Sequence, residues 1–196
     1  MNKKILVTGA NGQLGSELKV LSSHYSQFEW LFADRSFLDL SDLNSITKVL
    51  DSLQPQIIIN CAAYTAVDKA ETETELADLL NHQAVAVMAQ WSAAHDCRLV
   101  HISTDYVFDG NSSTALTEEA PTGPINVYGQ TKLAGEQACL REHPNAIVIR
   151  TSWVYSRFGN NFVKTMSRLM QDRDSLNVVN DQIGSPTYAA DLAQAI

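Results

Sequence analysis

The sequence predicts an α/β fold built around a doubly wound parallel sheet. Short runs rich in Ile, Val and Leu alternate with longer stretches that carry apolar residues at helical spacing. Such alternation favours parallel strands that are joined by right-handed helical crossovers. In addition, the polar and small residues that suggest chemistry follow directly after predicted strands, which is the edge where ligands bind in such sheets.

The composition is typical of one globular domain. The 196 residues are 45% hydrophobic and 18% charged, which is enough to bury a sizeable core. A net charge of −8 without a basic patch argues against a nucleic-acid partner. No apolar run approaches the ~20 residues that span a bilayer, and the N-terminus lacks the layout of a signal peptide. The sequence therefore predicts a cytoplasmic protein with no membrane partner.

The cysteines and histidines indicate neither disulfides nor a metal. Cys61, Cys97 and Cys139 are odd in number, widely spaced and set in apolar contexts, which predicts buried free thiols. The five histidines show no metal-ligand spacing with each other or with these cysteines, so we predict no metal site.

The first predicted strand, residues 5–7, ends at a glycine turn. Gly9, Gly12 and Gly15 follow at a spacing of three and three, and a helical pattern begins at Ser16. Glycines in this position permit positive φ and close approach of the backbone to a pyrophosphate, and the helix N-terminus favours the anion. A Rossmann-like dinucleotide site is therefore expected here.

A second strand, residues 29–33, ends at an acid. Asp34 lies about where a Rossmann ribose ligand is expected, ~20 residues after the glycines, although a surface turn is the alternative. Arg35 follows directly and could instead receive a ribose phosphate. Asp42 is a plausible N-cap for a helix over residues 43–53, which Pro55 ends.

The middle of the chain supplies two more strand ends. Residues 56–60 form an uninterrupted apolar run, as expected of a central parallel strand, and open into small residues at 61–63. These let a flat ligand lie close to the backbone, or they are simply small packing residues. After a mostly helical stretch over 73–94, the strand at 98–102 ends at Ser103, Thr104 and Asp105.

Tyr128 and Lys132 stand four residues apart, just before the helical pattern of residues 133–138. On a helix they share a face, and a nearby ammonium favours the phenolate form of a tyrosine. The alternative is an ordinary half-buried aromatic with a solvated neighbour. Farther on, we predict strands at 146–150 and 176–179, a helix at 161–170, a loop at 180–188 and the start of a helix at 191–196.

The glycine turn, the strand-end Ser103-Thr104 and the Tyr128-x-x-x-Lys132 pair together resemble the extended short-chain dehydrogenase/reductases. Longer strings are similar to the members of that family that reduce a dTDP-linked keto-sugar, and the resemblance covers nearly the whole chain. These strings are residues 66–71, 103–108, 126–136 and 150–155, extended by 160–162, 180–182 and 184–187.

The resemblance implies roles for the residues of a catalytic site. Tyr128 should donate a proton to the ketone oxygen, and Lys132 should hold the nicotinamide ribose and lower the pKa of Tyr128. Thr104 should hydrogen-bond the ketone, with Asp105 beside it on the substrate. Trp153 should pack against the sugar of the dTDP-sugar substrate, unless it is a plain core tryptophan.

The resemblance also implies NADPH or NADH as cofactor. Asp34 favours NADH and Arg35 favours NADPH, so we expect less than about a hundredfold preference either way. The resemblance leaves a homodimer open. The cofactor-binding residues it implies are Gly9, Gly12, Gln13, Leu14 and Gly15 at the pyrophosphate, Asp34, Arg35, Asp39 and Leu40 at the adenosine end, and Ala63, Tyr64 and Thr65 with Tyr128 and Lys132 along the nicotinamide half.

Three alternatives share this pattern. A dehydratase of the same superfamily would need a carboxylate at the third strand-end position, where Tyr106 stands. An epimerase shares the Tyr–Lys pair and differs mainly in the shape of its pocket. A non-catalytic NAD(P)-binding regulatory subunit also resembles the family, but in this chain the catalytic pair is intact.

The resemblance further implies a division of the chain. Residues 1–180 form an NAD(P)-binding Rossmann domain with the catalytic pair, and residues 181–196 begin a substrate-binding region whose C-terminal lobe is largely missing. On that view we expect a chain that binds NAD(P)H, reduces the sugar slowly or not at all, and associates through an exposed apolar edge.

Overall fold

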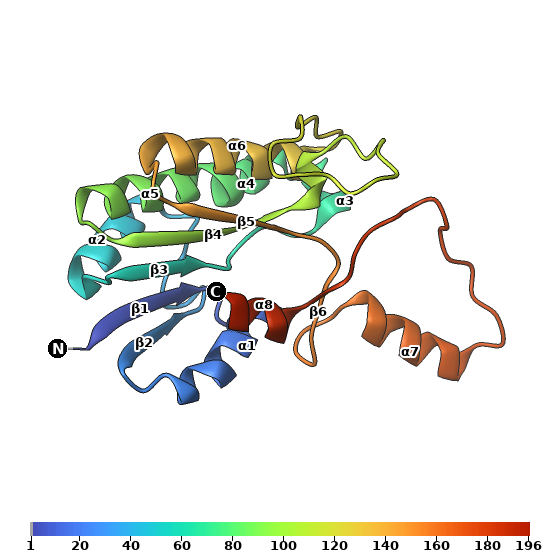
Figure 1. Cartoon of the computed structure of the whole chain (residues 1–196), viewed down its shortest axis with the longest axis horizontal. Coiled ribbons are helices and arrows are strands. Elements are labelled where there is room, and N and C mark those ends of the chain that lie inside the picture. The colour runs from blue at the N-terminus through green and yellow to red at the C-terminus, as the bar shows by residue number, and fades with distance from the viewer. Residues whose placement is uncertain (1) are drawn as a thin grey trace.

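A five-stranded, fully parallel sheet forms the centre of the computed structural model, which describes residues 2–196 (Figure 1). Its strand order is β2-β1-β3-β4-β5, so the chain turns one way from β1 to β2 and the other way from β3 onward. The predicted α/β, doubly wound fold is confirmed. The strands are β1 (Lys3–Thr8), β2 (Phe28–Ala33), β3 (Ile57–Asn60), β4 (Arg98–Thr104) and β5 (Ile147–Thr151).

Helices cover both faces of the sheet. In Figure 1, α2, α4, α5 and α6 lie on one face, and α1 and α8 lie on the other. Helix α2 begins as predicted, because the Asp42 carboxylate accepts hydrogen bonds from the N–H groups of Asn44 and Ser45. The helices are α1 (Gln13–Leu21), α2 (Leu43–Leu53), α3 (Val67–Ala70), α4 (Thr74–Asp78), α5 (Ala84–Ala94), α6 (Val127–Glu142), α7 (Phe162–Asp172) and α8 (Ala189–Ala195), with short 3₁₀ turns η1 (Ser22–His24) and η3 (Asp105–Val107) and a π turn η2 (Leu79–Gln83).

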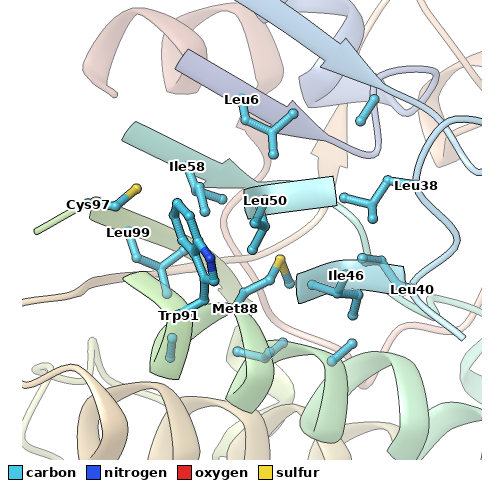
Figure 2. Packing of buried hydrophobic residues seen from close by; sticks show 14 of the residues in the cluster. Leu6, Leu38, Leu40, Ile46, Leu50, Ile58, Met88, Trp91, Cys97 and Leu99 are labelled. Carbon is cyan, nitrogen blue, oxygen red and sulfur yellow. The ribbon is translucent and has the colours of Figure 1, made fainter. Parts of the chain in front are cut away.

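Two hydrophobic cores lie on the two faces of the sheet. Side chains alternate along each strand, so Leu6 of β1 joins one core while Ile5 and Val7 join the other. The first core packs the sheet against α2 and α5, with Leu50 and Met88 fully buried (Figure 2). Burial on both faces explains why these strands read as continuous apolar runs.

The predicted free thiols are confirmed. Cys97 and Cys139 are buried and Cys61 is half-buried, and none of the three forms a disulfide. Burial raises the pKa of the Cys61 thiol to about 12 and those of Cys97 and Cys139 to about 11. All three are therefore neutral and unreactive near pH 7.

The strand predicted at residues 176–179 is wrong. These residues have no strand partner in the part of the chain that the structure describes, and Val178 and Val179 are 51% and 68% exposed. An apolar, β-branched run forms a strand only where a sheet edge is available to it. The pairing that does form is a small parallel sheet of β6 (Val154–Tyr155) with β7 (Thr187–Tyr188), and β7 falls inside the segment predicted as loop.

Helix α8 falls in the region predicted to begin substrate binding. It packs against α1, and its Leu192 and Ala193 join the second hydrophobic core. The division at residue 180 stays a prediction. Within residues 2–196, no helix is long and apolar enough to cross a membrane, and no group of three or more His, Cys, Asp or Glu side chains could hold a metal ion.

An ion pair joins the buried Glu136 carboxylate of α6 to the half-buried Arg150 of β5. Arg150 donates to the Glu136 carboxylate through Nη2 at 2.7 Å and Nε at 3.0 Å, and its guanidinium lies over the Phe108 ring. We expect Arg150→Met to lower the free energy of unfolding by about 3 kcal/mol, because it leaves a buried carboxylate unpaired. Urea unfolding measures this loss.

Two further variants test whether the loss of stability comes from the unpaired Glu136 carboxylate or from any substitution of an arginine. Adding Glu136→Gln to Arg150→Met should recover much of the stability, because no unpaired charge then remains buried. Arg141→Met removes an exposed pair with Glu142 on the same helix and should change stability by less than about 1 kcal/mol. Equal losses from Arg141→Met and Arg150→Met would contradict the assignment.

Candidate active site

The glycine turn lies where the strand order reverses, between the ends of β1 and β3. Gly9 has a φ of +65°, and a Cβ at that position would lie 2.7 Å from the backbone nitrogen of Ala62. Only glycine fits both the conformation and this close approach. Gly12 is the N-cap of α1, so the first N–H groups of that helix face the crevice.

A cleft of about 640 Å³ opens beside this turn, at the carboxyl edge of the sheet. It brings together segments that are more than 140 residues apart in the sequence, as predicted from the strand ends. Of the predicted site residues, its walls contain Gly9, Gly12, Gln13, Leu14, Ala63, Thr65, Thr104, Asp105, Tyr128, Lys132 and Trp153.

A second cavity of about 240 Å³ lies on the other side of the turn. Its walls include four predicted residues, Asp34, Arg35, Asp39 and Leu40. Gly9, Ala62 and Ala63 line both cavities, so the two form one groove that passes over the glycine turn. That shape suits an extended ligand whose two halves are joined at the helix N-terminus.

Asp34 is already engaged by its own turn. Its Oδ1 accepts hydrogen bonds from the hydroxyl and N–H of Ser36 and from the N–H of Phe37, and its Oδ2 accepts from Asn11. The bond from the Ser36 hydroxyl and the other donors hold the pKa of Asp34 below its usual range. Arg35 is exposed and lies 3.8 Å from Asp39 through Nε and Oδ1, which leaves its guanidinium free to turn into the cavity.

Two predicted cofactor residues line neither cavity. Gly15 instead packs α1 against the end of β1, since a Cβ there would collide with the Gly9 carbonyl oxygen. The Tyr64 hydroxyl points away to donate to Glu73 at 2.7 Å, a bond that raises the pKa of Tyr64 to about 12. The Tyr64 backbone is held by Asn81, which accepts from its N–H and donates to its C=O, and the Tyr64 side chain packs against the small cluster that contains Tyr128.

Helix α6 carries both members of the predicted Tyr–Lys pair. Asn126 caps the helix by accepting from the N–H of Gly129 at 2.7 Å, and this places Tyr128 in its first turn. Tyr128 and Lys132 are both buried and line the same cleft. The Lys132 ammonium donates to the Ile102 carbonyl at 2.7 Å, and burial lowers its pKa to about 8.

One electrostatic expectation is not met in this structure. Burial raises the pKa of Tyr128, with a smaller opposing effect from the Thr104 hydroxyl, and Lys132 does not lower it. The reason is that the Lys132 amine is directed at the β4 backbone rather than at the phenol. The pair shares a helix face, as predicted, but the Lys132 amine donates its hydrogen bond to the Ile102 carbonyl of β4.

Thr104 and Asp105 lie opposite Tyr128. The Thr104 hydroxyl donates to Asp105 Oδ1 at 3.0 Å and accepts from the N–H of Tyr106 at 3.2 Å. Burial raises the pKa of Asp105. The Tyr106 ring meets the Tyr128 ring edge-on at 5.5 Å between centroids, so it forms a wall and supplies no acid where a dehydratase would have one.

Trp153 is held in a left-handed conformation at the edge of the cleft. Its φ is +49°, which is a strained value for a bulky residue, and such strain concentrates at functional sites. Its indole meets the Phe162 ring edge-on, and Gly184 lies so close that a Cβ would be 2.6 Å from Trp153 Nε1. With 38% of it exposed, Trp153 is not a plain core tryptophan.

Asn81 was missed from the sequence, and Gln13, which was predicted at the pyrophosphate, has a further contact that was not predicted. Gln13 ties the glycine turn to the segment after β5 by donating to the Val154 carbonyl and accepting from Asn161. Asn81 bridges Tyr64 to the Thr131 hydroxyl on α6. Single polar residues inside long helical stretches carry no local signal, although an asparagine at a π turn is a feature that often marks a functional site.

Comparison with known proteins is consistent with this geometry. Residues 3–196 match the family model described as the RmlD substrate binding domain. A dTDP-4-dehydrorhamnose reductase of Aggregatibacter actinomycetemcomitans is 44% identical over 98% of this chain and 66% of its own length. A dTDP-4-keto-6-deoxy-D-glucose reductase of Streptomyces niveus is 44% identical over the whole chain and 68% of its own length.

A solved structure is similar to this chain in both sequence and fold. The dTDP-4-dehydrorhamnose reductase of Bacillus anthracis str. Ames, in complex with NADP, superposes with a TM-score of 0.94 at 43% identity, over all of this chain and 69% of that one. This chain spans about two thirds of the length of the curated relatives it matches, between 63% and 68%. A family model that covers residues 3–196, with relatives above 40% identity, shows that this chain belongs to the RmlD substrate binding domain family.

Proposed function

We propose that this chain carries the catalytic site of an NAD(P)H-dependent dTDP-4-dehydrorhamnose reductase, which reduces dTDP-4-dehydro-L-rhamnose to dTDP-L-rhamnose for cell-surface polysaccharide synthesis. One observation carries the proposal: a glycine-turn groove and an acid-bearing helix converge on one cleft, with Thr104 opposite Tyr128. The names of the similar proteins support the substrate. The three free thiols support a reducing compartment such as the cytoplasm.

The residues at the turn fit a dinucleotide. The cradle at Gly9 is space that a Cβ would fill, and the N-terminus of α1 offers unpaired N–H groups to a pyrophosphate. Arg35 and Asp39 would hold the adenosine ribose, and Ala63 with Thr65 would line the nicotinamide half. NAD(P)H, when bound, supplies the hydride, and a relative of this chain has been solved with NADP.

The chain's own residues supply the proton and the orientation. Tyr128 has a raised pKa and so remains a protonated phenol across the neutral range, ready to donate to a ketone oxygen as negative charge develops there. Thr104 is the second donor, and its hydroxyl would exchange the Asp105 carboxylate for the ketone oxygen. Lys132 lies behind Tyr128 in the cleft wall, where its N–H groups can hold a ribose hydroxyl.

A second substrate has a specific observation in its favour. The Streptomyces niveus relative is named for dTDP-4-keto-6-deoxy-D-glucose and is as similar as the rhamnose enzymes. Both sugars present a 4-ketone to the same donors, so Trp153 and the wall near Gly184 must decide between them. Dehydratase activity receives no such support, since Tyr106 stands where a dehydratase would have its additional carboxylate. An epimerase would share the Tyr128–Lys132 pair, and no similar protein named above is an epimerase.

The test is NAD(P)H oxidation by the purified protein with each keto-sugar in turn, together with cofactor affinity measured by fluorescence. Cofactor binding and consumption of NADPH with dTDP-4-dehydro-L-rhamnose would support the proposal. Faster turnover of the glucose-derived keto-sugar would move the assignment to the second substrate. Tight cofactor binding with little or no turnover is also expected of a chain that spans about two thirds of its relatives, so the assay is repeated on a version extended to the length of those relatives. Absence of turnover in the extended version would favour a non-catalytic NAD(P)-binding protein.

The choice of cofactor gives a separate prediction. Because Asp34 is occupied by its turn and the exposed Arg35 is held only by a 3.8 Å contact with Asp39, Arg35→Ala should weaken NADPH binding about tenfold and leave NADH binding within about twofold. Fluorescence titration of both cofactors measures the two ratios. Equal weakening of both would show that Arg35 does not contact the ribose phosphate.

A further inference from the structure

A buried chain of polar side chains runs behind Lys132, from α6 across three strands of the sheet. Lys132 Nζ lies 3.4 Å from Nε2 of His101 on β4, and Nδ1 of the same ring lies 3.0 Å from Asn60 Nδ2 on β3. Asn60 Oδ1 then lies 2.5 Å from the hydroxyl oxygen of Thr8 on β1. All four side chains are at most 2% exposed.

We propose that His101 is a positioning residue for Lys132, that the charge of Lys132 selects which ring nitrogen of His101 carries the hydrogen, and that Asn60 and Thr8 satisfy the ring in either state. The proposal deepens the proposed function, because it concerns the amine that would hold the cofactor ribose. His101 itself does not line the cleft. It therefore acts only through Lys132.

One arrangement of hydrogens follows from the amide as it is placed. The Thr8 hydroxyl donates to Asn60 Oδ1, so the Asn60 NH₂ donates to His101 Nδ1. The imidazole hydrogen is then on Nε2 and points at Lys132 Nζ. An ammonium has no lone pair to accept it, so this arrangement is matched to a neutral Lys132 amine.

The opposite arrangement, with the ring hydrogen on Nδ1 of His101, suits a protonated Lys132. A protonated Lys132 donates to Nε2, so the ring hydrogen must lie on Nδ1. A half-turn of the amide then presents Asn60 Oδ1 to the ring and the Asn60 NH₂ to the Thr8 oxygen. The Thr8 hydroxyl hydrogen turns away from Asn60, and its oxygen, which also accepts from the N–H of Ala62, accepts from the amide. Lys132 exchanges one proton with the cleft, while the imidazole keeps a single hydrogen that changes nitrogen.

The surroundings restrict titration to Lys132. Burial, and then the Lys132 charge, hold the pKa of His101 well below its usual range, so the ring stays neutral while Lys132 titrates near its pKa of about 8. The other ionisable groups around Lys132 are Glu136, paired with Arg150, the neutral thiol of Cys139 and Tyr128 on α6, Cys61 after β3, and Asp105 after β4.

The first experiment uses the unaltered protein. Nitrogen-15 NMR of the histidine ring nitrogens, from pH 6 to pH 10, reports the tautomer of His101 directly. We expect hydrogen on Nδ1 below about pH 7 and on Nε2 above about pH 9, one unit on each side of the Lys132 pKa of about 8. One unchanging tautomer, or an imidazolium at any pH in that range, would overturn the proposal.

The second experiment tests Lys132 through NADH affinity as a function of pH. His101→Phe removes the acceptor, and a buried ammonium loses more than a neutral amine does, so the pH at which affinity falls should drop by about one unit. His101→Gln keeps an amide oxygen in reach of Nζ and should restore the wild-type midpoint. Ser92→Ala removes a different buried hydroxyl, on α5, and should change nothing.

The results for the His101 variants decide the proposal as follows. A folded His101→Phe protein with the wild-type midpoint would overturn the proposal, as would failure of His101→Gln to restore the midpoint. If His101→Phe does not fold, the NMR titration and His101→Gln decide alone. None of these measurements uses a keto-sugar, so an absence of reduction would count against the proposed function and leave this inference standing.

Discussion

Replacing Tyr128 with phenylalanine is expected to lower turnover of the keto-sugar about 10³-fold while NADPH affinity stays within a few-fold. The phenol is the protonated donor that lines the cleft, and its neighbour there is the Thr104 hydroxyl, which belongs to the same site. Phenylalanine keeps the ring and its edge-on contact with Tyr106, so the change removes one hydroxyl. Steady-state kinetics and fluorescence titration measure the two quantities.

Tyr106→Phe is the matched control for this variant. It removes a hydroxyl from the neighbouring ring in the same cleft, and turnover should remain within about threefold because that ring serves only as a wall. A loss of cofactor affinity as large as the loss of turnover in Tyr128→Phe would show a structural role for the phenol. A comparable loss of turnover in Tyr106→Phe would move the acid to that position.

Much of the fold was predictable because the sheet is buried on both faces. Strands such as residues 57–60 then read as unbroken apolar runs, and Asp42 marks the start of α2 through its own side chain. The run at 176–179 has the same composition but no sheet edge beside it, and no local pattern reports that. The pairing of β6 with β7 joins residues about thirty positions apart and is likewise invisible locally.

The site was predictable to the extent that strand ends meet at one edge. Gly9, Thr104 and Tyr128 line one cleft because parallel topology brings them there. Side-chain direction was not predictable: Asp34 turns into its own loop, and Tyr64 turns toward Glu73. The polar chain behind Lys132 was missed for the same reason, since His101 and Asn60 read as ordinary members of two strands.

Lys132→Met is expected to weaken NADPH binding at least about tenfold and turnover about 10³-fold, because the residue is assigned the ribose contact that positions the nicotinamide half of the cofactor beside Tyr128. Cofactor titration and kinetics on one preparation give both values. An active variant with unaltered cofactor affinity would contradict that role. The same substitution should also remove a distinctive dependence of stability on pH.

The sign of that dependence follows from the lowered pKa. Folded Lys132 releases its proton near pH 8 and an unfolded lysine does so near 10.5, so between these values the unfolded chain binds more protons and stability rises with pH. The rise amounts to about 2 kcal/mol between pH 7 and pH 10. The buried thiols act in the opposite direction, because their pKa values are raised from 9.0 to about 11 or 12. The measurement is therefore the difference between wild type and Lys132→Met in urea unfolding at each pH. The free energy of unfolding of wild type should rise relative to that of Lys132→Met as pH increases from 8 to 10. A constant difference would mean that Lys132 is not buried as a cation.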